Sequence, residues 1–269
     1  MYYIKAEDQV KLAVYDLNPR GKNVIIMIHG WPLSAKMFEY QKEFLVQRGY
    51  RVICMDLRGF GHSDVPASGY TYDQMAGDLY RLVRVRQLQR FTLLGFSMGG
   101  AVAVRYMARY HGYGVKKLCL CAAAIPSFTE RPGFPYGMAR EHVDDLIILA
   151  KEDRPELCEN FSLQLFANPH SAAVIEWFRL IALSASGMGT VRCAYALRDE
   201  DCSKDLNHIH VPTGIFHGEK DDIVPFAAAE VTHDAIPGSI LFPFANSSHG
   251  IVYDELALFN HTLLEFLSE

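Results

Sequence analysis

The stretch Gly95-Phe96-Ser97-Met98-Gly99-Gly100 most restricts how this chain can fold. An apolar run at 91–94 precedes it, and a helical pattern at 101–109 follows it. A strand that passes directly into a helix needs a tight turn. Glycines on both sides of Ser97 remove side chains that such a turn cannot accommodate. The stretch therefore predicts a strand–turn–helix junction that lifts the Ser97 hydroxyl out of a sheet.

The pattern G-x-S-x-G at such a junction is typical of a nucleophile elbow. The N–H of Met98 would then lie unbonded at a helix N-terminus, where negative charge is favoured. Chance also produces this short pattern, and the alternative is a glycine-rich turn with an idle serine. The rest of the chain must therefore supply a base, an acid and an oxyanion hole.

Continuous apolar runs, rich in β-branched residues, alternate with helical patterns. The runs at 24–28, 51–55 and 115–121 are typical of strands buried on both faces of a parallel sheet. An earlier strand is expected at 10–15. Ser34 is expected to cap a helix to about Arg48, and Asp73 one to about Leu88. This alternation predicts an α/β class with a doubly wound, mostly parallel sheet.

The alternation stops after residue 125. Until about residue 205 the chain is helical in character, and it then resumes with strands at 211–216 and 239–244. We therefore predict a core of residues 1–125 and 206–269 and an inserted helical cap at 126–205. Helices of the cap are expected at 139–151, 155–166, 172–184 and 189–197.

Functional groups of open α/β sheets gather at the carboxyl ends of the strands. Those ends carry Ser97, then an acidic loop at 217–222, and last His249. A nucleophile, an acid and a histidine thus follow one another in the order of an α/β-hydrolase triad. His249 is the expected base, because it follows the last strand among small residues.

The acid is expected in the loop at 217–222, which contains Glu219, Asp221 and Asp222. A carboxylate is required to hold the imidazole tautomer and to stabilise the imidazolium. Asp221 is preferred, because the residues after it lead directly into the next helix. Asp222 is the main alternative.

An oxyanion hole needs two donors directed at one point. The Met98 N–H is the first. The second is expected from the turn after the strand at 24–28, where Pro32 has no N–H and Trp31 is the natural donor. Asp56 and Arg58, in a polar loop after the next strand, are expected to tie loops together rather than to take part in chemistry.

Composition narrows the class of protein. The chain has 269 residues, 50% of them hydrophobic, and a formal net charge of −5. These values predict a soluble globular protein without a nucleic-acid or membrane partner, and the N-terminus predicts a cytoplasmic location. No metal or cofactor motif is found. The cysteines are expected to be buried and reduced: Cys54, Cys119, Cys121, Cys158, Cys193 and Cys202.

Five motifs together resemble the α/β-hydrolase superfamily, and more narrowly its cofactor-free haloperoxidase, arylesterase and perhydrolase branch. They are HGWP (29–32), DLRGFGHSD (56–64), GFSMGG (95–100), HGEKDDIVPF (217–226) and SSHG (247–250). The resemblance implies the α/β-hydrolase fold with about eight strands and a cap. It also implies Ser97 as nucleophile, Asp221 as acid, His249 as base, and Trp31 with Met98 as oxyanion donors. Haloalkane dehalogenases and epoxide hydrolases are disfavoured, because they place aspartate where Ser97 stands.

The predicted function is hydrolysis of a small carboxylic ester through an acyl-enzyme, with perhydrolysis as a side activity. A carbon–carbon bond hydrolase with the same triad and a small-molecule receptor with vestigial turnover are the alternatives. An apolar substrate pocket is expected between core and cap, lined by Phe128, Phe161, Trp177 or Phe178. The sequence does not decide the oligomeric state and leaves a homo-oligomer open.

Overall fold

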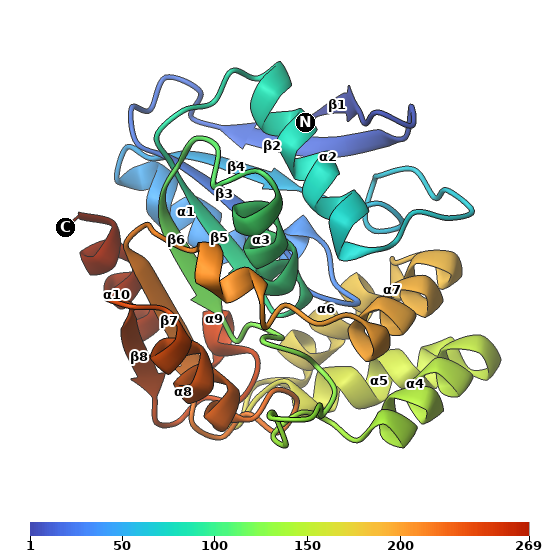
Figure 1. Cartoon of the computed structure of the whole chain (residues 1–269). Helices are drawn as coiled ribbons and strands as arrows, with labels where there is room; N and C mark the ends of the chain where they lie inside the picture. The colour runs from blue at the N-terminus through green and yellow to red at the C-terminus, as the bar shows by residue number, and fades with distance from the viewer. Residues whose placement is uncertain (269) are drawn as a thin grey trace.

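A computed structural model describes residues 1–268, and within them eight strands form one mixed sheet in the order β1-β2-β4-β3-β5-β6-β7-β8 (Figure 1). β1 and β2 run antiparallel to their neighbours, and β4 to β8 are mutually parallel with β3. The strands are β1 (Tyr2–Lys5), β2 (Lys11–Leu17), β3 (Val24–Ile28), β4 (Arg51–Met55), β5 (Phe91–Phe96), β6 (Val115–Cys121), β7 (Thr213–Gly218) and β8 (Ile240–Phe244).

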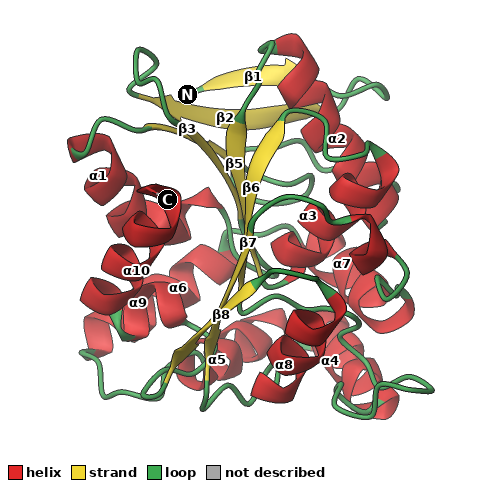
Figure 2. Ribbon diagram, turned by 60° about the vertical axis from the view of Figure 1, so that its left-hand side comes forward, coloured by secondary structure: helices red, strands yellow, loops and turns green. Residues whose placement is uncertain are grey.

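Helices cover both faces of this sheet. Figure 2 shows α1 and α10 on one face and α2, α3 and α8 on the other. Every residue of β5 is buried as a result, which explains its unbroken apolar sequence. The core helices are α1 (Glu39–Gln47), α2 (Tyr72–Val85), α3 (Met98–Arg109), α8 (Phe226–Ala235), α9 (Ile251–Asp254) and α10 (Leu256–Ser268). The α/β-hydrolase fold predicted from the sequence is confirmed.

Between β6 and β7 the described chain contains several α-helices but no strand of the sheet. They are α4 (Arg140–Glu152), α5 (Arg154–Gln164), α6 (Ala172–Leu183) and α7 (Gly187–Asp199). All of them lie within the range 126–205, where the sequence predicts the cap. Helices α4 and α7 pack together, as do α5 and α6, so they form a layer of their own (Figure 1).

At the local level one strand was not predicted, one expected N-cap is confirmed and another was wrong. β1 was not predicted, and it pairs with β2 along the sheet edge. Ser34 is the N-cap residue, as expected, because its hydroxyl accepts from the Lys36 N–H at 3.4 Å. The helical stretch after it begins as a 3₁₀ turn, Ala35–Phe38, and continues as α1. The N-cap residue of α2 is Thr71 and not Asp73, because the Thr71 hydroxyl accepts from the Gln74 N–H at 3.2 Å.

The cysteines behave as predicted: within the described residues all six are buried and free. In residues 1–268 no single helix is long and apolar enough to cross a membrane. α6 and α7 reach that length and composition only as a pair bent by 92°.

Candidate active site

Ser97 occupies the one-residue turn between β5 and α3. Its φ of 53° and ψ of −122° are strained for a residue with a side chain. Backbone hydrogen bonds hold the strain in place: the Ser97 N–H donates to the Cys121 carbonyl at 2.9 Å, and the Ser97 carbonyl accepts from Gly100 and Ala124. The predicted strand–turn–helix junction is therefore present.

The glycines around Ser97 are required by close backbone approach. A Cβ on Gly95 would collide with the backbone of Gly99 and Gly100, where α3 folds back over the strand. A Cβ on Gly99 would collide with the carbonyl oxygens at the end of β3. Gly30 lies against the turn itself, because a Cβ there would come within 2.7 Å of the Ser97 Cβ. Glycine alone lets the loops after β3 and β5 approach each other this closely.

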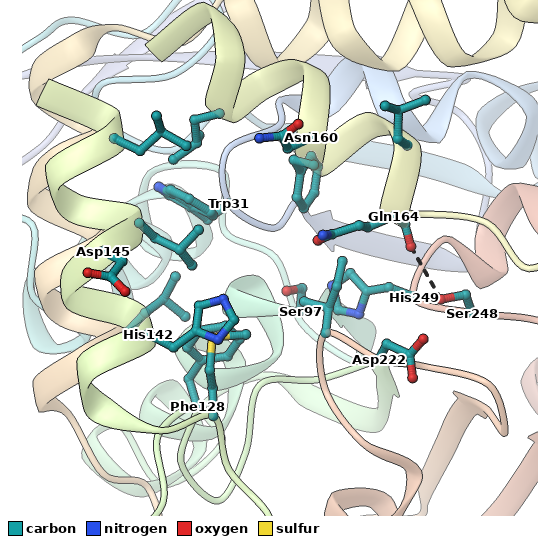
Figure 3. A pocket seen from close by; sticks show the side chains of 18 of the residues that line it. Trp31, Ser97, Phe128, His142, Asp145, Asn160, Gln164, Asp222, Ser248 and His249 are labelled. Atoms are coloured by element: carbon teal, nitrogen blue, oxygen red, sulfur yellow. Dashed lines mark hydrogen bonds between the residues drawn. The ribbon is translucent and has the colours of Figure 1, made fainter. Parts of the chain in front are cut away.

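His249 follows β8 and is fully buried. Its Nδ1 lies 2.8 Å from Asp221 Oδ2. Because an ionised carboxylate only accepts, this contact places the proton on Nδ1 and leaves a lone pair on Nε2. His249 Nε2 is buried and has no hydrogen-bond partner among residues 1–268. Figure 3 shows the Ser97 side chain beside the His249 ring, and both line the same cavity.

The groups around Asp221 stabilise the ionised form of its carboxyl group. Its Oδ1 accepts from the N–H groups of Ile223 and Val224 at 2.9 and 2.8 Å. Its Oδ2 faces His217 Nε2 at 3.3 Å as well as His249. Burial alone would raise the pKa of the Asp221 carboxyl. The close contacts with the His249 and His217 rings outweigh burial and hold that pKa far below its ordinary value.

The other two carboxylates of this loop do not contact His249. Asp222 is exposed and its side chain lines the cavity, whereas Glu219 is exposed and contributes its N–H to the Phe244 carbonyl. The geometry therefore favours Asp221 over Asp222 as the partner of His249.

The two expected oxyanion donors are free. Met98 is the first residue of α3, and Trp31 lies in the turn after β3. Neither backbone N–H donates a hydrogen bond within the described residues. The Trp31 side chain is fixed separately, because its Nε1–H donates to the Thr190 carbonyl of α7 at 2.8 Å and its ring packs edge-on against Phe161.

His29 is the other histidine close to this turn, and it has no free nitrogen. Its Nε2 accepts from the Leu57 N–H at 3.0 Å, so Nδ1–H donates to the Gly30 carbonyl at 2.9 Å. Complete burial lowers the pKa of His29. This histidine holds two loops together and is not available as a base.

A cavity of about 1010 Å³ opens above Ser97. The core contributes Trp31, Ser97 and His249, while α4, α5 and the segment before α4 supply most of the remaining wall (Figure 3). That wall is mainly apolar: Phe128, Met138, Leu146, Leu149, Leu157, Phe161, Leu163, Phe166 and Leu197. The cap thus lies over the carboxyl ends of the strands.

The pocket residues proposed from the sequence divide into two pairs. Phe128 and Phe161 line the cavity. Trp177 and Phe178 do not, so this expectation was wrong. Both rings belong to α6 and pack against Tyr253 of α9. They join the cap to the core behind the cavity wall.

Asp56 and Arg58 have the structural role that the sequence predicts, but two other groups near the site were not predicted. Asp56 accepts from the Ala35 N–H, and the fully buried Arg58 pairs with Asp78 at 2.7 Å, which confirms loop-tying roles. His217, the second histidine on Asp221, was missed, although its place at the end of β7 was a signal. Asp254 was missed because nothing in the sequence marks it.

A family model described as the alpha/beta hydrolase fold matches residues 23–142. The AB hydrolase superfamily protein YisY of Bacillus subtilis (strain 168) is 48% identical over 265 residues and covers 98% of each chain. The chain belongs to the α/β-hydrolase superfamily. This α/β-hydrolase is also similar to an esterase from Exiguobacterium antarcticum, at 43% identity, TM-score 0.97 and 99% coverage of both chains.

A second solved structure extends the range of chemistry among its relatives. The bromoperoxidase from Bacillus anthracis is 33% identical, with a TM-score of 0.93 and 100% coverage of both chains. The resemblance to the esterase and haloperoxidase branch is thereby confirmed. Membership of this family indicates that the α/β-hydrolase is an enzyme. Within residues 1–268, no group of three or more His, Cys, Asp or Glu side chains is arranged to hold a metal ion.

Proposed function

We propose that this protein is a serine hydrolase that cleaves small carboxylic esters through an acyl-enzyme. One observation carries the proposal: a buried imidazole with a free Nε2 lies beside a strained serine, and its Nδ1 contacts a buried carboxylate at 2.8 Å. A buried polar atom without a partner is costly, so its persistence beside Ser97 is readily explained by a proton-transfer role.

In the first half-reaction His249 Nε2 takes the Ser97 hydroxyl proton as Oγ attacks the ester carbonyl. Asp221 stabilises the imidazolium that forms. The N–H groups of Trp31 and Met98 bind the oxyanion, and one such donor is worth about 10²–10³-fold in kcat. Collapse of the tetrahedral intermediate breaks the ester bond. The imidazolium then gives its proton to the departing alcohol.

In the second half-reaction His249 takes a proton from water as the water oxygen attacks the acyl-enzyme. The bond from the acyl carbon to Ser97 Oγ then breaks, the imidazolium returns its proton to Oγ, and the carboxylic acid is released. If hydrogen peroxide attacks in place of water, the product is a peracid. The similarity to a bromoperoxidase supports this as a side activity.

The mainly apolar wall contributed by the cap suits an uncharged acyl chain or an aryl alcohol group. Phe128 and Phe161 are the proposed contacts for that group, while Trp177 and Phe178 have no part in it. Absence of a cofactor, a cytoplasmic location and a possible homo-oligomer remain predictions from the sequence.

A panel of p-nitrophenyl esters from acetate to octanoate tests the proposal, with Ser97→Ala as the control. We expect turnover of short and medium chains by the wild-type protein and its loss in the variant. Absence of hydrolysis with every ester would contradict the proposal, and so would equal turnover by Ser97→Ala.

A further inference from the structure

The side chain of Asp254, at the end of α9, is fully buried and lies outside the machinery described above. Within the described chain its two oxygens accept from four donors. Oδ2 accepts from the N–H groups of Ala167 and Ser248 at 2.7 and 2.9 Å. Oδ1 accepts from the Asn168 N–H and from His170 Nε2, both at 3.0 Å. These donors fill the four acceptor positions of a carboxylate.

The four donors come from two different parts of the molecule. Ser248 immediately precedes His249, whereas Ala167, Asn168 and His170 belong to the cap loop between α5 and α6. The Asp254 carboxylate therefore joins the loop that carries His249 to the cap. Charge-assisted hydrogen bonds of this kind are shorter and stronger than neutral ones, so the joint is firm.

Further contacts join the loop that carries His249 to the cap on the C-terminal side of His249. The Gly250 N–H donates to the Leu165 carbonyl at 2.7 Å. A Cβ on Gly250 would lie 2.6 Å from the Phe166 ring, so the two loops are in direct contact. His249 thus lies between Ser248, whose N–H is bonded to Asp254, and Gly250, whose N–H is bonded directly to the cap.

We propose that Asp254 is a positioning residue for His249, fixing its loop against the cap so that Nε2 remains directed at Ser97. This inference rests on the proposed function. The hydrogen bond to Asp221 orients the imidazole ring of His249, but it does not fix the backbone that carries the ring. Displacement of a reacting group by about 1 Å can cost about 10²-fold in rate.

Asp254→Asn is the direct test, since an amide nitrogen cannot accept from the N–H groups that now face the carboxylate. We expect kcat for the best p-nitrophenyl ester to fall by about 10–100-fold, with KM within about threefold of wild type. Asp16→Asn is the matched control. Asp16 is a largely buried carboxylate on β2, paired with Arg51 at 2.6 Å, and it does not line the cavity. Its kcat should stay within about twofold, because the ion pairs that are lost, with Arg51 at 2.6 Å and with Arg86 at 3.4 Å, involve no residue that lines the cavity.

A second readout separates this inference from the ester reaction itself. The His249 Nδ1–H, bonded to Asp221, should give a downfield proton resonance in NMR that disappears in His249→Gln. We expect that resonance to shift or broaden in Asp254→Asn and to be unchanged in Asp16→Asn. If no ester is hydrolysed by wild type, the proposed function fails, while this resonance still tests the positioning role.

Asp254→Glu covers the case in which the asparagine variant does not fold. It keeps the charge but displaces the carboxylate by one methylene, and we expect a several-fold lower kcat at similar KM. A folded Asp254→Asn with wild-type kcat and an unchanged resonance would overturn the inference. Wild-type values for both readouts in Asp254→Glu would do the same.

Discussion

Among single residues, the acid of the site gives the sharpest test. Asp221 contacts His249 at 2.8 Å, and its neighbour Asp222 is exposed to the cavity. Asp221→Asn should lower kcat by about 10³–10⁴-fold, because an amide favours the wrong imidazole tautomer. Asp222→Asn should change kcat by less than about threefold, since it removes an exposed charge. Steady-state kinetics with one ester measures both, and the opposite ranking would move the acid by one residue.

Charge on the cavity wall makes a second prediction. Glu141 and Asp145 of α4 and Asp222 line the cavity, and among residues 1–268 none of the three forms an ion pair; Lys220 is the one lysine or arginine that also lines it. A substrate with a terminal carboxylate would meet this negative field. We expect kcat/KM for mono-p-nitrophenyl adipate to be about tenfold below that for p-nitrophenyl hexanoate, a difference of about 1.4 kcal/mol.

The deficit should shrink at high salt, because screening weakens the repulsion, and it should shrink in Asp145→Asn. Equal rates for the two esters at low salt would show that the wall carboxylates do not select substrates.

The place of Ser97 and His249 at the cavity could be predicted from the sequence, because Ser97 directly follows β5 and His249 lies in the loop after β8. Parallel strands bring their carboxyl ends to one edge of the sheet. The pocket aromatics could not be separated in the same way. Trp177 and Phe178 belong to α6, whose sequence is apolar around most of its circumference, so its inward face is not encoded in a simple period. Asp254 was invisible because its role depends on donors far away in sequence.

Among the elements, the junction of β5 and α3 should be the least tolerant of added volume. Gly99→Ala would push a methyl group into the carbonyl oxygens at the end of β3, and we expect a loss of about 1–3 kcal/mol in the free energy of unfolding. Gly187→Ala is the matched control, because a Cβ there meets nothing within 4 Å at the start of α7.

The control should be neutral or stabilising by about 0.4–1 kcal/mol. Urea denaturation measures both changes. Equal stability of the two variants would show that the turn accommodates a methyl group at position 99, which would contradict the close backbone contacts there.

The sheet and the cap helices were largely predictable, because long buried runs and helical patterns carry a strong periodic signal. The misses are short or depend on tertiary contacts. β1 has four residues and buries only Ile4, so it carries almost no pattern. Asp73 looks like a helix cap in sequence but instead pairs with Arg105 and Arg109, which leaves capping to Thr71.

For the whole molecule, burial of the thiols makes a prediction that does not depend on activity. Burial raises the pKa of Cys54 to about 12 and raises that of the other cysteines as well. Since the thiolate is the reactive form, the native protein should not react with Ellman's reagent at pH 8. After unfolding in guanidinium all six thiols should react. Rapid labelling of the native protein would contradict the tightly packed core described here.

The proposed mechanism requires that Ser97 becomes acylated during turnover. Rapid quenching of a p-nitrophenyl ester reaction in acid, followed by peptide mass spectrometry, measures this directly. We predict an acyl adduct on Ser97 whose formation accompanies release of p-nitrophenol, with no such adduct in Ser97→Ala. Steady turnover with no adduct, or with the adduct on another residue, would contradict the mechanism.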